Sequence, residues 1–189
     1  HLWHEVEQVR EHLTAERNHR TLELYALFVA ALAFPHLDRH GLREFAFEQL
    51  HANLLADVRS DGVHRECSTH YHCIVLRSFL GAMQNARLAG MPVPASYVER
   101  VTLASEFALH CHRPDGRIPA CSDADSEGYA DVLRLAGSLL DRPDFVWAAS
   151  AGREGAVPAR RHVGFPAGGY FIQRSGWGTD RPYEDGRFL

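Results

Sequence analysis

The 189-residue sequence contains no lysine, so all 20 of its basic residues are arginine. Surfaces that bind nucleic acid usually mix lysine and arginine in dense positive patches, and the net charge of -4 also argues against such a surface. Arginine favours the local recognition of carboxylate or sulfate groups, because its planar guanidinium can donate two parallel hydrogen bonds. We therefore expect no nucleic-acid partner.

Long apolar runs are missing too. The longest, residues 22–34, is interrupted by Glu23 and is shorter than the roughly 20 residues that a membrane-spanning helix needs, so we expect a buried helix and no membrane partner. The four cysteines show no Cys-x-x-Cys spacing, and a chain of this size needs no disulfide to hold its core. The chain starts at His1 and stops just after a strand-like stretch, so we interpret it as a fragment cut at both ends.

The rest of the composition, with 46% hydrophobic and 23% charged residues, is that of a folded globular domain. Apolar residues recur at helical spacing near residues 2–14, 19–34, 39–57, 69–89, 95–111 and 125–140. Short turns separate these segments, so successive helices should pack as antiparallel neighbours in two layers. The pattern predicts a mainly α fold whose core contains Leu24, Leu27, Phe28, Leu50, Leu54, Leu76, Phe79, Leu80, Leu103, Phe107, Leu133 and Leu135.

The character of the sequence changes after residue 141. Glycine and proline are frequent from Pro143 onwards, and residues 169–175 are rich in residues that favour strands. We therefore divide the chain into a helical part at 1–142, a linker at 143–162 and the start of a β-domain at 163–189. A stable sheet normally needs three or more strands, so we expect the strand at 169–175 to pair with neighbours that this chain mostly lacks.

The first candidate site is Asn18-His19-Arg20, at the start of the buried helix. Asn is a preferred N-cap, because its side chain accepts a hydrogen bond from an early N–H group of the helix, and this structural role would explain Asn18. The same position also suits anion binding, since a helix N-terminus presents unpaired N–H groups and partial positive charge. The residues alone leave both interpretations open.

The second candidate site is the turn and helix start at residues 61–72, where Ser68 or Thr69 is suited to be the N-cap. Ionisable and phenolic side chains gather there: Arg65, Glu66, His70, Tyr71 and His72. Successive residues of a helix project about 100° apart, so one or two of the last three can face one site. A zinc site is the rival interpretation, but the spacing of the histidines and cysteines matches no common zinc pattern, and we expect no metal.

Four motifs resemble, in this order, landmarks of the heparinase II/III and alginate-lyase-like superfamily of polysaccharide lyases. They are Asn18-His19, then residues 61–72, then Pro-Asp-Gly-Arg-Ile-Pro at 114–119 with Ser-Asp-Ala-Asp-Ser at 122–126, then Gly-Gly-Tyr-Phe at 168–171 with Arg-Ser-Gly-Trp-Gly at 174–178. One departure is Cys121-Ser122-Asp123, where the family often has Gly-Asp. The resemblance implies an incomplete (α/α) toroid of antiparallel helix pairs, followed by the first strands of an antiparallel β-sandwich.

The resemblance also implies β-elimination on a uronic-acid-containing acidic polysaccharide, without a cofactor. Asn18 and His19 match the residues that neutralise the uronate carboxylate. Tyr71 matches the tyrosine that protonates the leaving oxygen and, in some members, also removes the C5 proton. A phenol has a pKa near 10, so we expect nearby cations to lower the pKa of Tyr71. Substrate contacts are expected from Arg20, Arg65, Glu66, His70 and His72.

The family places a further histidine from the β-domain over the cleft, so we expect part of the active site, with the remainder of the β-sandwich, to lie outside this chain. The resemblance implies a bacterial protein that is periplasmic or secreted. Two other functions stay open: an inverting hydrolase using carboxylates such as Glu66, Asp123 or Asp125, and a noncatalytic glycan-binding or scaffold module.

Overall fold

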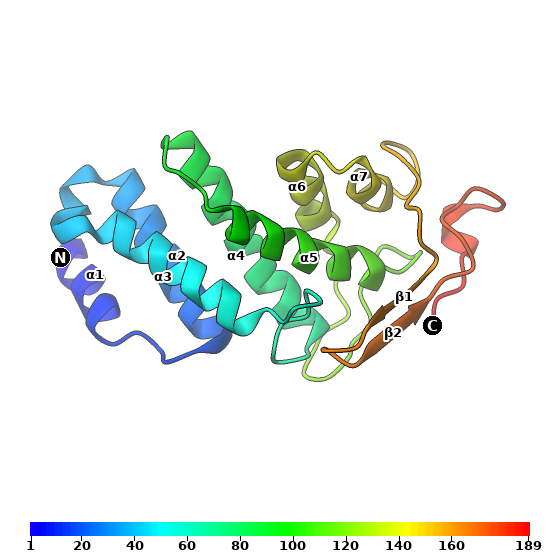
Figure 1. Cartoon of the computed structure of the whole chain (residues 1–189), viewed down its shortest axis with the longest axis horizontal. Coiled ribbons are helices and arrows are strands. Elements are labelled where there is room, and N and C mark those ends of the chain that lie inside the picture. The colour runs from blue at the N-terminus through cyan, green and yellow to red at the C-terminus, as the bar shows by residue number, and fades with distance from the viewer.

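The computed structural model describes all 189 residues, and the two termini lie at opposite ends of an elongated molecule (Figure 1). Helices come first and an antiparallel sheet follows, which confirms the predicted fold class. No helix has the length and apolar character to cross a membrane. The elements are α1 (Leu2–Glu11), α2 (Arg17–Ala33), α3 (Leu42–Asp57), α4 (Thr69–Leu88), α5 (Ala95–Cys111), α6 (Ala130–Leu140), α7 (Pro143–Ala149), β1 (His162–Phe165) and β2 (Tyr170–Gln173), with short 3-10 turns at Pro35–Leu37, Arg39–Gly41 and Tyr183–Asp185.

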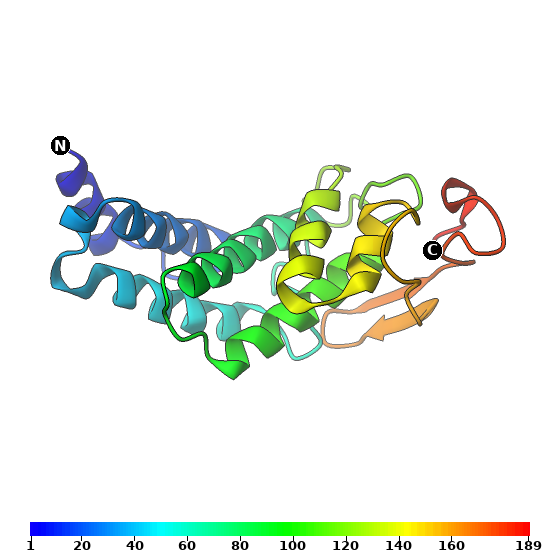
Figure 2. The same cartoon turned by 90° about the horizontal axis from the view of Figure 1, so that it is seen from above.

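Helices α2 to α5 run back and forth along the long axis, each antiparallel to the next, and α6 and α7 lie across it (Figure 2). The backbone N–H of Arg17 donates to the Asp57 carboxylate at 2.9 Å, which joins the start of α2 to the end of α3. The Tyr97 hydroxyl donates to the carbonyl of Phe79 at 2.9 Å, which joins the first turn of α5 to the second half of α4. Hydrogen bonds between neighbouring helices thus accompany the predicted antiparallel packing.

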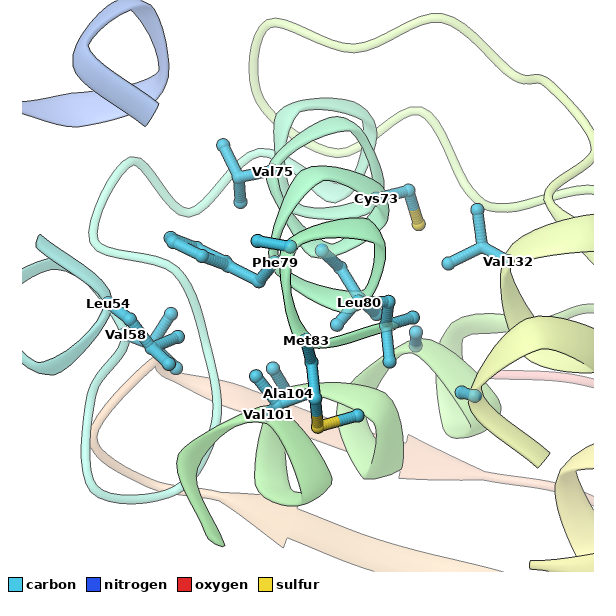
Figure 3. Close-up of a cluster of buried hydrophobic side chains, with 14 of the residues drawn as sticks. Leu54, Val58, Cys73, Val75, Phe79, Leu80, Met83, Val101, Ala104 and Val132 are labelled. Atoms are coloured by element: carbon cyan, nitrogen blue, oxygen red, sulfur yellow. The ribbon is translucent and has the colours of Figure 1, made fainter. Parts of the chain in front are cut away.

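Helix α4 lies in the middle of the core. In Figure 3 its side chains point toward different neighbours: Cys73 toward α6, Phe79 toward α3 and the loop after it, and Met83 toward α5. A helix surrounded in this way has to be apolar nearly all round. The predicted core residues are buried except Leu103 and Leu135, which are half-buried, and Leu103 borders a cavity between α5 and β1.

The segment 143–162, predicted as a linker, contains helix α7. Pro143 stands at its first turn, where a missing N–H costs no hydrogen bond. Phe145 and Ala148, three residues apart, are both buried. Pro143 therefore begins a helix and does not mark a break in structure, while the role of 143–162 as a linker stays a prediction. The boundary between the helical part and a β-domain stays a prediction.

Strand β2 has a neighbour on each side. Strand β1 runs antiparallel along one edge, with Val163 opposite Ile172. On the other edge, Gln173 and Leu189 exchange two backbone hydrogen bonds of 2.8 and 2.9 Å. The expectation that this strand pairs mostly with missing neighbours was wrong, because the last residues of the chain fold back against it.

The turn between β1 and β2 is fastened to the loop that joins α3 to α4. The guanidinium of Arg59 donates to the carbonyl of Ala167 at 2.6 Å. The carboxylate of Asp61 accepts a hydrogen bond from the backbone N–H of Gly168 at 2.9 Å. The hairpin is thereby held against the same loop that leads into α4.

Candidate active site

A polar cavity of about 450 Å³ opens where α4 begins. The start of α2, the loop between α3 and α4, the first turn of α4 and the loop after α5 all contribute to its wall. The residues that line it are Arg17, Arg59, Arg65, Glu66, Ser68, Tyr71, Ser122 and Asp123. Arginines outnumber carboxylates in this wall, which favours an anionic ligand.

Ser68 places Tyr71 at this cavity. Ser68 has an extended backbone conformation before the first turn of α4, and its hydroxyl accepts a hydrogen bond from the backbone N–H of Tyr71 at 3.1 Å. The same hydroxyl donates to the carbonyl of Asp123 at 2.7 Å. The prediction that Ser68 or Thr69 caps this helix is confirmed for Ser68. One buried side chain thus fixes both the helix start and the loop that carries Asp123.

The hydroxyl of Tyr71 donates to Oδ2 of Asp123 at 3.2 Å. The negative charge of this carboxylate, together with its hydrogen bond, raises the pKa of Tyr71, and Glu66 and Asp125 add smaller effects in the same direction. The expectation that cations lower the pKa of Tyr71 was therefore wrong. Tyr71 stands in the cavity as a protonated phenol that is ready to donate.

The two histidines beside Tyr71 differ in their surroundings. His72 is buried, with Nε2 donating to the carbonyl of Ala104 at 2.9 Å and Nδ1 accepting from the backbone N–H of His64 at 3.3 Å. Burial lowers the pKa of His72 to about 3, so its ring is neutral and belongs to the core instead of making the predicted substrate contact. His70 packs edge-on against the ring of Tyr71 at a centroid distance of 5.7 Å, and its contact with substrate stays a prediction.

Asp57 binds two of the three arginines of the wall, Arg17 and Arg65. Its buried carboxylate accepts the backbone N–H of Arg17 at 2.9 Å and the guanidinium of Arg65 at 3.2 Å. Arg65 also donates to Glu16 at 2.7 Å. The start of α2 is therefore held at the cavity by a residue forty positions further along the chain.

Asn18 does not cap α2. The helix begins at Arg17 and its N-cap residue is Glu16, so Asn18 is already the second helical residue. Asn18 is 8% exposed, and its side chain makes no hydrogen bond within the chain. His19 is exposed. Arg17 lines the cavity and these two residues do not, so their convergence with Tyr71 stays a prediction.

Arg20 is occupied by contacts within the helical part. Its guanidinium donates to the carbonyl of Thr14 at 2.9 Å and to the side chain of Gln49 at 2.8 Å. These bonds hold α2 against the preceding loop and α3. These bonds give Arg20 a structural role, and its contact with substrate stays a prediction.

Glu66 lies between the cavity and a buried histidine. One of its carboxylate oxygens has no hydrogen-bond partner and stands 3.8 Å from Nδ1 of His64. Burial, with a smaller effect of Arg65, lowers the pKa of His64 to about 4, so the ring is neutral at pH 7 and the two groups form no ion pair. Binding of substrate by Glu66 stays a prediction.

A second cavity, of about 480 Å³, lies between α5, α7 and β1. Its Arg142 is already paired with Glu106 at 2.5 Å and with Asp144 at 2.6 Å. No three His, Cys, Asp or Glu side chains lie together where they could hold a metal ion. The cavity at the start of α4 is therefore the better candidate for an anionic substrate.

Arg17 and Arg59 were not predicted as site residues, and Ser122 and Asp123 were named in a family motif without a predicted contact to Tyr71 or the cavity. Arg17 directly precedes the Asn18 motif, and an entirely arginine-based positive charge was a signal for anion recognition. No local pattern marks Arg59, whose place depends on the turn between β1 and β2.

A family model described as the heparinase II/III N-terminus matches residues 3–141. A heparin-sulfate lyase of Bacteroides stercoris is 27% identical over 174 residues, which are 88% of this chain and 26% of that protein. A heparin-sulfate lyase of Pedobacter heparinus is 23% identical over 180 residues, which are 92% of this chain and 27% of that protein. The chain spans about a quarter of the length of these curated relatives.

Solved structures show the same fold. A crystal structure of heparinase III superposes with a TM-score of 0.83 at 19% identity, over 92% of this chain and 29% of that one. The heparan sulfate lyase HepC of Pedobacter heparinus gives a TM-score of 0.77 at 22% identity, over 92% of this chain and 28% of that one. Their agreement supports an incomplete toroid followed by strands. Since the family model covers most of its residues, this chain belongs to the heparinase II/III family.

Proposed function

We propose that the full-length protein is a polysaccharide lyase that cleaves a uronic-acid-containing polysaccharide by β-elimination. The relatives are named heparin-sulfate lyases, which makes a sulfated uronate polymer the first substrate to test. The observation that carries the proposal is the cavity at the start of α4, where the Tyr71 hydroxyl and three arginines share one wall. Elimination needs both a group that binds a carboxylate and a group that moves a proton.

In the proposed reaction the C5 proton is removed, its electron pair forms the C4–C5 double bond, the C4–O4 bond breaks and O4 takes up a proton. The C5 proton is weakly acidic until the carboxylate charge is neutralised. Arg17, Arg59 and Arg65 supply positive charge to the cavity. Asn18 and His19, in the first turn of α2 beside Arg17, add hydrogen-bond donors and the partial positive charge of the helix start.

Tyr71 acts in this proposal as the general acid/base. Its raised pKa keeps the hydroxyl protonated at neutral pH, which suits the transfer of a proton to O4. Removal of the C5 proton by Tyr71 requires the phenolate form. A histidine of the β-domain, which the family resemblance implies, is the other base and lies outside this chain.

Tyr71→Phe in the intact protein tests the proposal. Turnover of a panel of uronate polymers, followed by the ultraviolet absorbance of the unsaturated product, should fall by about 10²–10⁴-fold with little change in KM. Tyr25→Phe is the matched control, because the Tyr25 hydroxyl makes no hydrogen bond within the chain and lies on α2. Wild-type turnover by Tyr71→Phe would contradict the assignment.

One alternative has a specific observation in its favour, since the carboxylates Glu66 and Asp123 line the same cavity. An inverting glycosidase needs such a pair on either side of the scissile bond. New reducing ends without an unsaturated product would establish hydrolysis. Polysaccharide binding without either product would identify a noncatalytic module.

We also propose that the protein is periplasmic or secreted, because a long acidic polymer does not diffuse through a lipid bilayer. Fractionation of the source cells, followed by immunodetection of the protein, tests this. Recovery in the cytoplasmic fraction alone would contradict it.

A further inference from the structure

The loop at residues 119–123 is attached to the beginning of α4. The Ser68 hydroxyl donates to the carbonyl of Asp123 at 2.7 Å. The hydroxyl of the next residue, Thr69, donates to the carbonyl of Pro119 at 2.5 Å. Both donors are buried residues at the helix start. The backbone of this loop is therefore placed by the same turn of chain that begins α4.

From this fixed backbone the Asp123 side chain reaches the hydroxyl of Tyr71, with Oδ2 as the acceptor at 3.2 Å. Ser122, just before it, has a φ of 64°, a left-handed conformation that is unfavourable for a residue with a side chain. Such a conformation persists where surrounding contacts enforce it. The other groups that face Tyr71 or its cavity are the carboxylates of Glu66 and Asp125, the ring of His70, and the guanidinium groups of Arg17, Arg59 and Arg65.

We propose that Asp123 is a positioning residue for Tyr71: its carboxylate holds the hydroxyl as a hydrogen-bond donor and keeps it protonated until substrate enters the cavity. This inference rests on the proposed role of Tyr71 in proton transfer. A phenolate at this position would face a carboxylate at hydrogen-bond distance, so the proton is retained. O4 of the substrate then replaces Asp123 as the acceptor, takes the proton as the C4–O4 bond breaks, and the phenolate regains a proton from water.

Ultraviolet titration of the tyrosines in this chain tests the inference without any assay of activity. The contribution of Tyr71 is obtained by subtracting the curve of Tyr71→Phe. In the wild-type chain its midpoint should lie above the ordinary tyrosine pKa of about 10. Asp123→Asn should move the midpoint down, and Asp123→Glu, which keeps the carboxylate, should leave it raised. Asp125→Asn is the matched control, because Asp125 affects Tyr71 by charge alone and should give a smaller shift.

Three results would overturn the inference: a wild-type Tyr71 midpoint at or below about 10, an Asp123→Asn midpoint equal to that of the wild type, or a shift no larger than that of Asp125→Asn. The first of these measurements needs no Asp123 variant, so it can overturn the inference even if Asp123→Asn does not fold.

The intact protein gives a second readout. The high-pH limb of kcat/KM reports the acid of the free enzyme and should move down in Asp123→Asn. A role confined to holding the loop would lower activity at every pH and leave this limb in place, which would also overturn the inference. The expected titration shift in a protein that releases no unsaturated product would support the contact between Asp123 and Tyr71 and refute the proposed function.

Discussion

Ser68→Ala should destabilise this chain more than the loss of a single hydroxyl usually does. The Ser68 hydroxyl accepts from the N–H of Tyr71 at 3.1 Å and donates to the carbonyl of Asp123 at 2.7 Å. Loss of a serine N-cap costs about 1 kcal/mol, and loss of one further hydrogen bond costs about 1 kcal/mol. The free energy of unfolding should therefore fall by about 2 kcal/mol, and Tm by about 4–8 °C for a domain of this size.

Urea denaturation followed by circular dichroism measures this change, provided that the slope of the transition matches that of the wild type. Ser126→Ala is the matched control. Ser126 lies in the loop after α5, and its hydroxyl donates to the carbonyl of Ile118 at 3.0 Å without capping a helix. That variant should lose about 1 kcal/mol. A loss for Ser68→Ala no greater than that of Ser126→Ala would refute the double role of Ser68.

Other substitutions and pH test separate parts of the structure. Gly62→Ala should cost about 3 kcal/mol of stability in urea denaturation, because the added Cβ would lie 2.1 Å from the carbonyl oxygen of Leu103 at a φ of +93°, and wild-type stability would contradict this. Asn18→Ala should lower the turnover of the intact protein without changing the unfolding free energy of this chain, and a loss of about 1 kcal/mol would show that Asn18 is a cap after all. Burial lowers the pKa of several histidines in the folded state, so between about pH 6.5 and pH 4 the unfolded chain binds more protons than the folded chain. The free energy of unfolding should therefore fall as the pH drops through this window, by about 3 kcal/mol for each histidine whose pKa is lowered to about 4. These histidines are His64, His110 and His112, with pKa values of about 4, and His72, with a pKa of about 3. Urea denaturation at each pH measures the change, and a free energy of unfolding that stays constant over this window would argue against burial of these rings.

Features that depend on neighbouring residues could be predicted from the sequence. The helices follow the spacing of apolar residues, and α4 begins directly after Ser68, whose side chain bonds within its own turn. Tyr71, His70 and His72 diverge as helical geometry requires, and Tyr71 is the one of the three that lines the cavity. In each case the deciding interaction spans a few residues, so the local sequence contains the information.

Features that depend on distant contacts could not be predicted in this way. Asn18 resembles a cap, but α2 begins earlier, with the N–H of Arg17 bound to Asp57 forty residues away. The pKa of Tyr71 is raised and not lowered, because Asp123, fifty-two residues away, contacts its hydroxyl. In both cases a buried or fixed carboxylate from another element outweighs the adjacent residues.

The fastening of the β1–β2 turn to Arg59 and Asp61 has a consequence for protein engineering. Arg59 is a wall residue of the cavity, and its guanidinium is oriented by the carbonyl of Ala167. A chimera that joins these helices to the hairpin of a relative would have to carry matching residues at 59–61, or the arginine would lose its support. A junction placed between α7 and β1 would therefore separate Arg59 and Asp61 from the turn that they bind. The sequence between α7 and β1, rich in glycine and proline, nevertheless resembles a linker.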